Sequence, residues 1–264
     1  MISRAVRQGI KVAALPAGMT RRPRPTDLTI LLYHRVGLGD REIDLDMRAF
    51  REQLEILASA GGVTSLDQAL ADGGERGGIV LSFDDGFRDF FDHVLPPLVD
   101  RRIPALLYLA TGFVANGVTS AVPRDEALTW EQLREAISTG LISVGSHTHN
   151  HVDLSKASAD EARDEMVRSK ELIEDRLGVP CRHFAYPWAV ASPVADRVAR
   201  ELFESAALDA WRTNRGSSVD PHRLGRMPIL RSDSPFFFRA KVRGRLDAEA
   251  WAYRVLRRGP WGRA

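Results

Sequence analysis

Short apolar runs recur along this chain, and longer stretches with helical periodicity lie between them. The clearest run spans 28–33 (L-T-I-L-L-Y), where five of six positions are apolar. Continuous runs of this length are typical of strands that are buried on both faces. We therefore predict strands at 28–33, 79–81, 105–109, 141–146, 182–186, 205–208 and 224–230.

The intervening stretches carry apolar residues three and four positions apart, as amphipathic helices do. Thr129 and Gln132 match an N-terminal capping box, and Gly178 follows the longest helical stretch as a stop signal. These patterns predict helices at 47–60, 65–71, 89–101, 129–140, 158–177, 194–203 and 235–258.

Strands that alternate with helices form parallel βα units. Seven such units within roughly 210 residues predict the α/β class, as a deformed (β/α)7-type barrel in a single domain. The first strand is followed by neither G-x-G-x-x-G nor G-x-x-x-x-G-K-[ST], which argues against a nucleotide-binding sheet. We expect the barrel at 28–234, a basic flexible arm at 1–27, and a basic helical tail at 235–264 that packs on the barrel or extends from it.

Composition changes this picture only at the two ends of the chain. The 264 residues carry a formal net charge of +2, so no overall field for nucleic acid or another polyanion is expected. Basic residues are concentrated before Asp27 and after Pro235. These ends are either solvated charge runs or a contact with an anionic membrane or polymer, and both interpretations stay open.

The single cysteine, Cys181, excludes an internal disulfide framework and fits a reducing compartment. The apolar stretch from Val12 to Leu15 is too short for the core of a signal peptide, and no run reaches the ~20 apolar residues of a spanning helix. We therefore expect a cytoplasmic protein with peripheral membrane contact through its basic ends. The oligomeric state is open.

Candidate chemistry follows two of the predicted strands. The segment 82–86 (S-F-D-D-G) comes after the run at 79–81, and 147–151 (H-T-H-N-H) comes after the run at 141–146. Ligands of α/β folds gather at the carboxyl ends of parallel strands. Two adjacent carboxylates repel each other, so a cation or a shared proton has to stabilise them.

Asp85, His147 and His151 form a two-histidine, one-carboxylate set with open coordination positions, as catalytic metal sites have. Zn²⁺ suits these ligands best, and Co²⁺, Ni²⁺ or Fe²⁺ can bind the same set. For H-x-x-x-H alone, a histidine-rich surface loop is the alternative. We expect the adjacent Asp84 to take a proton from water, with a helix cap or a supporting role as the alternative. Gly86 allows a sharp turn or a close approach to substrate.

These motifs resemble those of the polysaccharide deacetylases, the nodulation-protein-B-like carbohydrate esterases of family four. The segment 82–86 resembles their [TS]-F-D-D-G motif, 147–151 matches H-[ST]-x-x-H, and 184–187 (F-A-Y-P) resembles one form of their third motif. The opening 32–36 (L-Y-H-R-V) is also similar to many members, so the resemblance covers about 28–233. The fold that it implies is a deformed (β/α)7 barrel.

The resemblance implies metal-dependent hydrolysis of N-acetyl groups on the amino sugars of a glycan or glycoconjugate, with release of acetate. It makes Asp84 the general base and the backbone N–H of Tyr186 an oxyanion donor, with Pro187 shaping the substrate groove. The metal ligands that it implies are Asp85, His147 and His151.

The sequence departs from the family at two places. Many members have an arginine in the third motif that orients the base, where this chain has Ala185; Arg226 is the candidate substitute, with a plain surface salt bridge as its alternative. Many members also have a general-acid histidine in a late L-x-[IL]-x-H segment, whereas 229–233 (I-L-R-S-D) has none. His34 is our first candidate for the acid, and the weaker ones are His149 and His222; a structural role is the alternative for each.

Trp188 directly follows the third motif and is expected to line the groove, with core packing as the alternative.

The functional interpretation is a metal-dependent N-deacetylase of carbohydrates. Two alternatives stay open. One is a related barrel amidohydrolase that acts on another C–N bond, such as a cyclic ureide. The other is a carbohydrate-binding protein that retained the metal and lost its general acid.

Overall fold

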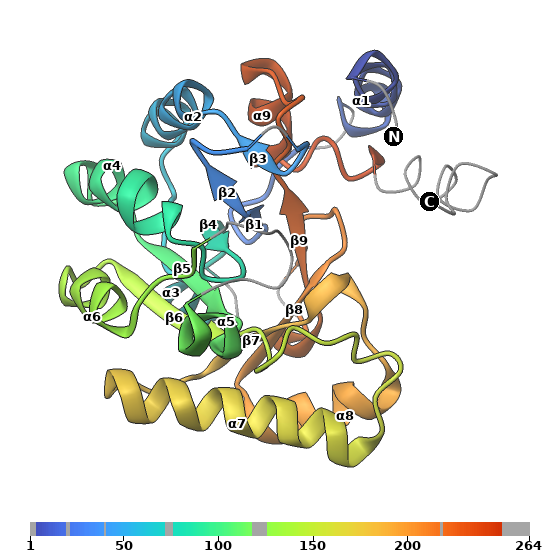
Figure 1. The fold of residues 1–264 in the computed structure, drawn as a ribbon. Helices are drawn as coiled ribbons and strands as arrows, with labels where there is room; N and C mark the ends of the chain where they lie inside the picture. Colours follow the sequence, from blue (N-terminus) through green and yellow to red (C-terminus); the bar gives the residue numbers. More distant parts are fainter. Residues whose placement is uncertain are drawn as a thin grey trace.

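A closed barrel of parallel strands forms the centre of the protein, as the computed structural model shows (Figure 1). The structure describes residues 4–19, 22–39, 41–71, 76–117, 126–216 and 219–249. The strands follow one another around the barrel in chain order, and β9 closes it by pairing with β1. These strands are β1 (Leu28–Tyr33), β4 (Gly78–Phe83), β5 (Ala105–Leu109), β6 (Ile142–Ser146), β7 (His183–Ala185), β8 (Ser205–Asp209) and β9 (Leu224–Pro228). The prediction of a deformed (β/α)7 barrel is confirmed.

Alternation along the strands separates two apolar layers. Since successive side chains of a strand point to opposite faces, one set fills the barrel and the other faces the helices. The inner cluster contains Leu28, Ile30, Val80, Leu106, Tyr108, Ala185, Ala207 and Leu224. Their neighbours Leu31, Leu81, Leu107, Phe184 and Met227 belong to a larger cluster with the helices. By the same count of two, His34, Asp84 and Arg226 lie on the inner side.

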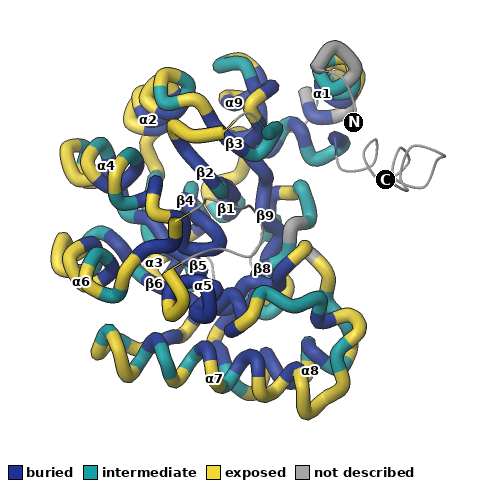
Figure 2. The backbone as a smooth tube through the Cα atoms, in the orientation of Figure 1, coloured by how far each residue is buried: buried dark blue, intermediate teal, exposed yellow. Residues whose placement is uncertain are grey.

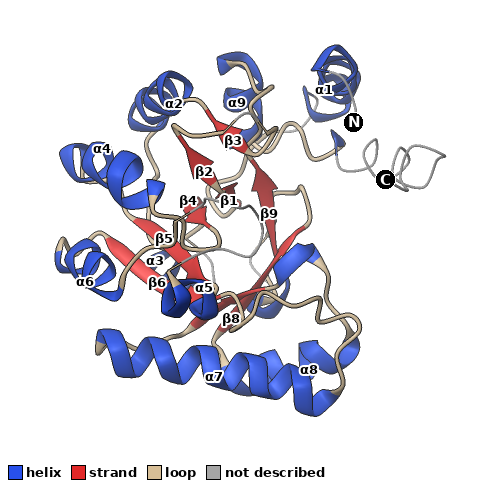
Figure 3. Cartoon of the chain, viewed as in Figure 1, coloured by secondary structure: helices blue, strands red, loops and turns tan. Residues whose placement is uncertain are grey.

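Helices surround the barrel, and their outer sides carry most of the exposed residues (Figures 2 and 3). They are α2 (Met47–Ala60), α4 (Leu95–Arg101), α5 (Thr111–Asn116), α6 (Trp130–Ser138), α7 (Ala159–Leu177), α8 (Pro193–Leu202) and α9 (Pro235–Val242), whereas α3 (Leu66–Leu70) packs with Leu66 and Ala69 in the inner cluster. Shorter elements are the parallel pair β2 (Arg35–Val36) and β3 (Asp44–Leu45), the π-helical η2 (Phe90–Val94), and the 3-10 turns η3 (Pro187–Ala189) and η4 (Pro221–Arg223). The capping box of Thr129 and Gln132 is present, and Gly178 ends α7 with a φ of 67°.

The tail helix predicted at 235–258 is shorter in the structure. It ends at Val242, and Gly244 follows with a φ of 61°, a left-handed conformation that favours glycine and stops a helix. Residues 250–264 lie outside the described part of the chain. The helix α5 was not predicted, because six residues are too few to show a helical period.

The N-terminal segment also differs from the expectation of a flexible arm at 1–27, because residues 4–19 form the helix α1 (Arg4–Met19). Its buried side carries Lys11, whose Nζ lies 2.5 Å from Asp233 Oδ1 and donates to Ser232 Oγ at 2.7 Å. Both charged side chains are fully buried. A lysine at a buried position hides the apolar period of a helix, and its partner is remote in the sequence. For these reasons the sequence pattern did not predict α1.

Candidate active site

Four of the predicted site residues come from three adjacent strands of the barrel. Asp84 and Asp85 follow β4, His34 follows β1, and Arg226 lies within β9. Because β1 pairs with both β4 and β9, the inner side chains of these strands meet in the barrel. His147 follows β6, which β5 separates from β4.

Arg226 binds Asp84 through two hydrogen bonds inside the barrel. Its Nη1 donates to Oδ1 at 2.6 Å, and its Nη2 donates to Oδ2 at 2.9 Å. The two residues are 1% and 3% exposed, and the guanidinium lies 5.3 Å from the ring of Tyr108. Arg226 therefore takes the place expected for the missing family arginine. The alternative of a surface salt bridge is wrong, because the pair is buried.

The charge state of Asp84 follows from this pairing. Burial alone would raise the pKa of its carboxyl, but the guanidinium of Arg226 and the nearby His147 outweigh that effect and hold the pKa below its ordinary value. The carboxylate is therefore ionised at neutral pH, which is the state that a general base needs.

Asp85, His147 and His151 bring three ligand atoms together. Asp85 Oδ1 lies 3.2 Å from Nε2 of His151 and 3.6 Å from Nε2 of His147, and the three ligand atoms all lie within 4.8 Å of one another. The backbone is left-handed at three positions here, with φ of 73° at Asp85, 65° at Thr148 and 55° at His151. Such conformations cost about 1–3 kcal/mol each and are concentrated at functional sites.

Two observations show that this set fits a divalent cation. Asp85 Oδ1 is buried, and none of the hydrogen bonds within the described residues satisfies it. His147 Nδ1 lies 2.8 Å from the carbonyl oxygen of Ala185. Since a carbonyl only accepts, Nδ1 carries the proton, and Nε2 presents its lone pair beside Asp85. Burial lowers the pKa of His147 to about 4, so the ring is neutral at pH 7, as a ligand has to be.

Gly86 makes the turn after the two carboxylates. Its φ is 84°, and a Cβ at this position would lie 3.0 Å from Leu109 Cδ2. Its carbonyl accepts a hydrogen bond from the N–H of Leu128 at 2.9 Å. The left-handed backbone and the close contact both favour glycine, so the predicted sharp turn is confirmed.

The loop of the histidine ligands is held by Glu165 of α7, which the sequence analysis did not single out. Its Oε2 accepts hydrogen bonds from the N–H groups of His149 at 3.0 Å and Asn150 at 2.8 Å, and its Oε1 accepts one from Asn150 Nδ2 at 2.6 Å. The only signal in the sequence is its position. Glu165 occupies a place in the buried stripe of α7, where an apolar residue is usual.

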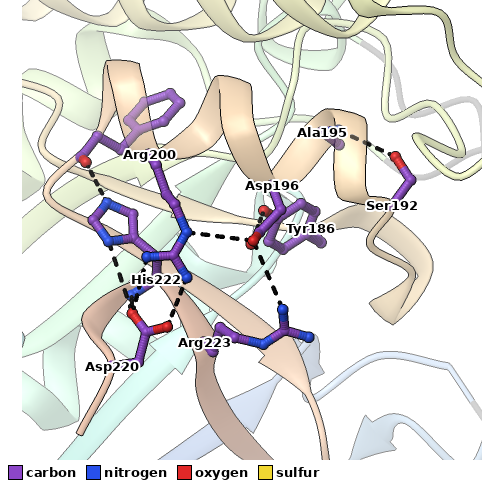
Figure 4. A network of polar contacts seen from close by, with 9 residues as sticks. Tyr186, Ser192, Ala195, Asp196, Arg200, Asp220, His222 and Arg223 are labelled. Carbon is purple, nitrogen blue, oxygen red and sulfur yellow. Dashed lines mark hydrogen bonds and ion pairs between the residues drawn. The ribbon is translucent and has the colours of Figure 1, made fainter. Parts of the chain in front are cut away.

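The three histidines that are candidates for the general acid lie in different surroundings. His34 is half-buried and follows β1, the strand that pairs with β4 directly before the two carboxylates. His149 turns away from the metal ligands: its Nδ1 lies 2.9 Å from Thr111 Oγ1. His222 lies outside the barrel, where its Nε2 is 2.8 Å from the carbonyl oxygen of Phe203 (Figure 4). Of the three, His34 remains beside the carboxylates.

The prediction that the backbone N–H of Tyr186 is an oxyanion donor is wrong. This N–H donates to the carbonyl of Ala207 at 3.0 Å, alongside the pairing of β7 with β8. Its side chain also points away from the metal ligands, because Tyr186 follows the inward-facing Ala185 by one residue. The hydroxyl donates to Asp196 Oδ1 at 3.4 Å, in a polar network between α8 and η4 (Figure 4).

Pro187 and Trp188 follow as the first residues of η3. Trp188 is 61% exposed, so the alternative of core packing is wrong. Its ring centroid lies 4.9 Å from that of His151, and its indole N–H donates to the His151 carbonyl at 3.2 Å. The tryptophan therefore forms an exposed aromatic wall beside one of the metal ligands.

Glu165→Gln tests how far the metal set depends on its support. An amide nitrogen would replace one acceptor oxygen and oppose N–H donors of the loop, so the affinity for Zn²⁺ should fall by about 10- to 100-fold. Equilibrium dialysis of the purified protein measures this affinity. Glu171→Gln, at an exposed position of the same helix, is the control and should bind Zn²⁺ as the wild type does. Equal affinities for both variants would contradict the role of Glu165.

Comparisons with known proteins agree with this geometry. The family model of polysaccharide deacetylases matches residues 72–203, half of the chain. The polysaccharide deacetylase-like protein YxkH of Bacillus subtilis (strain 168) is 24% identical over 170 residues, which cover 62% of this chain and 57% of YxkH. The poly-β-1,6-N-acetyl-D-glucosamine N-deacetylase of Escherichia coli (strain K12) is 32% identical over 79 residues, which cover 27% of this chain and 12% of that enzyme.

Solved structures share the fold. The Streptococcus pyogenes deacetylase PplD, in complex with acetate, superposes with a TM-score of 0.72 and 24% identity, covering 83% of this chain and 99% of PplD. The chain spans little more than half the length of YxkH, the first of its curated relatives. The segment matched by the family model contains both carboxylates and both histidine ligands. This chain belongs to the polysaccharide deacetylase family.

Proposed function

We propose that this protein is a metal-dependent hydrolase that removes N-acetyl groups from the amino sugars of a glycan and releases acetate. One observation carries the proposal: two adjacent carboxylates have different nearest partners, Asp85 the imidazole of His151 and Asp84 the guanidinium of Arg226, while Nε2 of His147 lies 3.6 Å from Asp85 and 3.7 Å from Asp84. This division matches a ligand and a base in one site. The name of the Escherichia coli relative, an N-deacetylase of poly-β-1,6-N-acetyl-D-glucosamine, supports the choice of substrate.

Zn²⁺ is the cation that we propose, because neutral imidazoles and a carboxylate suit it, and Co²⁺, Ni²⁺ and Fe²⁺ are the other ions for metal analysis to test. The ligands would be Asp85 Oδ1 and the Nε2 atoms of His147 and His151. When bound, the ion supplies a Lewis acid that polarises the acetyl carbonyl and lowers the pKa of water.

We assign to Asp84 the role of accepting the proton of the water that attacks the acetyl carbonyl. Its Oδ2 lies 3.7 Å from Nε2 of His147, so the base borders the position of the ion. Arg226 binds both carboxylate oxygens and so fixes their orientation. Arg226 thus acts through Asp84, as a positioning residue.

The leaving amine has to gain a proton, and we assign this step to His34. The residue follows β1 on the inner side, and β1 pairs with β4 along its whole length. It takes the task that a late histidine has in many members of the family.

Trp188 and Pro187 are the residues that we assign to the wall of the groove, where the exposed indole face can stack on a sugar ring. Gly86 makes the sharp turn beside the carboxylates. The cytoplasmic location expected from the sequence stays a prediction.

Metal analysis combined with acetate detection on N-acetylglucosamine oligomers tests the proposal. Asp84→Asn should lower kcat by about 100- to 10,000-fold and keep the metal, because it removes the base alone. Asp85→Ala and His147→Ala should lose the metal as well. Equal metal loss in all three variants would contradict the division between base and ligand. Opening of a cyclic ureide without acetate release, or glycan binding without turnover, would instead favour the two alternatives.

Arg226→Lys tests the positioning of the base. A lysine replaces two parallel hydrogen bonds by a single point charge, so kcat should fall by about 100-fold while KM and metal content stay unchanged. The pKa of Asp84 should rise, because Arg226 is the main group that lowers it, so the acidic limb of the pH–rate profile should move to higher pH. Arg223→Lys, at an exposed position before the same strand, is the control. A change in KM alone would contradict this role.

His34→Asn tests the general acid with two leaving groups. Deacetylation of the sugar amide should slow by about 100-fold or more, since an amine leaves only after protonation. Hydrolysis of 4-nitrophenyl acetate should change little, because the nitrophenolate leaves without a proton. His222→Asn should affect neither substrate. An equal loss on both substrates would show that His34 has another role.

A further inference from the structure

The helix α1 turns its charged side toward the protein and its uncharged, apolar side toward solvent, the reverse of an ordinary surface helix. Among its described side chains, the exposed residues are Gly9, Val12, Ala13 and Pro16, and Val12 is 58% exposed. Their spacing of three and four positions places them on one face of the helix. This outer face carries no charged residue, whereas an ordinary surface helix turns its charges toward water.

The inner side of α1 holds the charges and fixes the orientation of the helix. Lys11 is bound to Asp233 and Ser232 in the buried contact described above, and Arg7 lies 3.8 Å from Glu42. Gly18 approaches the backbone of Arg245 so closely that a Cβ would lie 1.9 Å from its carbonyl oxygen. Rotating α1 to hide its apolar face would leave a buried carboxylate without this partner. The outer face is therefore held toward solvent.

A second exposed apolar side chain lies on α9, the neighbour of α1. Phe236 is 61% exposed, and its ring packs 5.6 Å from that of Phe237. Phe237 in turn shares a small apolar cluster with Ala14 of α1. The helices α1 and α9 thus lie next to each other, at the periphery of the molecule and away from β4 and β6 (Figure 1).

Positive charge accompanies this surface. Arg22 and Arg24 are exposed just after α1. Glu249, the last described residue, is buried 3.6 Å from Lys241 of α9. The rest of the sequence, 250–264, contains four arginines, two tryptophans and a tyrosine but no acidic residue. Arginine with tryptophan and tyrosine is the composition of segments that bind at the interface of anionic membranes.

We infer that the outer face of α1, together with Phe236 and the exposed Arg22 and Arg24, docks on the surface of an anionic lipid bilayer. A small apolar face bordered by arginines matches the interfacial binding of amphipathic helices. A symmetric contact with a second copy would bring the arginines of both copies together, which like-charge repulsion disfavours. Among the described residues, no helix is long and apolar enough to cross a bilayer, so the contact is with the surface.

Sedimentation of the full chain with vesicles tests this inference. The wild type should bind vesicles of phosphatidylglycerol and phosphatidylcholine and not vesicles of phosphatidylcholine alone, and 0.5 M salt should weaken the binding. Val12→Glu should weaken it by about tenfold or more, because it removes one apolar anchor and adds a negative charge. Val99→Glu is the matched control: Val99 is an exposed valine of α4, and this variant should bind as the wild type does.

Three outcomes would overturn the inference: no binding of the wild type to the anionic vesicles, equal weakening by both variants, or a dimer in light scattering that Val12→Glu converts to a monomer. The last would identify the face as a contact between copies. Unchanged thermal melting and Zn²⁺ affinity of Val12→Glu show that the variant is folded. Activity on soluble oligomers reports on the deacetylase proposal separately, because Val12 lies outside the active site.

Discussion

The buried ion pair between Arg226 and Asp84 is the interaction on which the candidate site depends. Two carboxylates on adjacent residues cannot both stay ionised inside a barrel unless positive charge compensates them. Arg226 compensates Asp84 from β9, the strand that closes the barrel against β1. Asp85 is then stabilised by the imidazoles, so the two carboxylates can have different roles. Closure of the barrel and the chemistry at its end are therefore coupled.

The residues of the candidate metal site lie on irregular backbone that the regular elements hold in place. Asp85, Thr148 and His151 are all left-handed, which none of these residues favours by itself. The carboxylate of Glu165 stabilises the loop by accepting hydrogen bonds from its backbone, and the carbonyl of Ala185 fixes the tautomer of His147. Rigid strands and helices thus supply the orientation, while the strained loops supply the ligand atoms.

The two sides of α1 have separate roles: one holds the helix on the barrel, and the other is the face that we propose docks on a bilayer. The inner charge of Lys11 holds the helix on the barrel, and the same contact turns Val12 toward solvent. Since this surface lies apart from β4 and β6, docking there leaves the active site free of the contact (Figure 1).

The sequence by itself determined the parallel barrel, because apolar runs and helical periods are local patterns. It also predicted the three residues of the candidate metal site, because they stand in two short motifs at strand ends. It could not predict that the N–H of Tyr186 donates to the carbonyl of Ala207 in β8. Nor could it predict that Glu165 holds the histidine loop by hydrogen bonds. The tertiary structure decided that α1 is a docked helix and that Arg226 meets Asp84. Each of these features depends on a partner far away in the chain, and only the closed barrel brings such partners within hydrogen-bond distance.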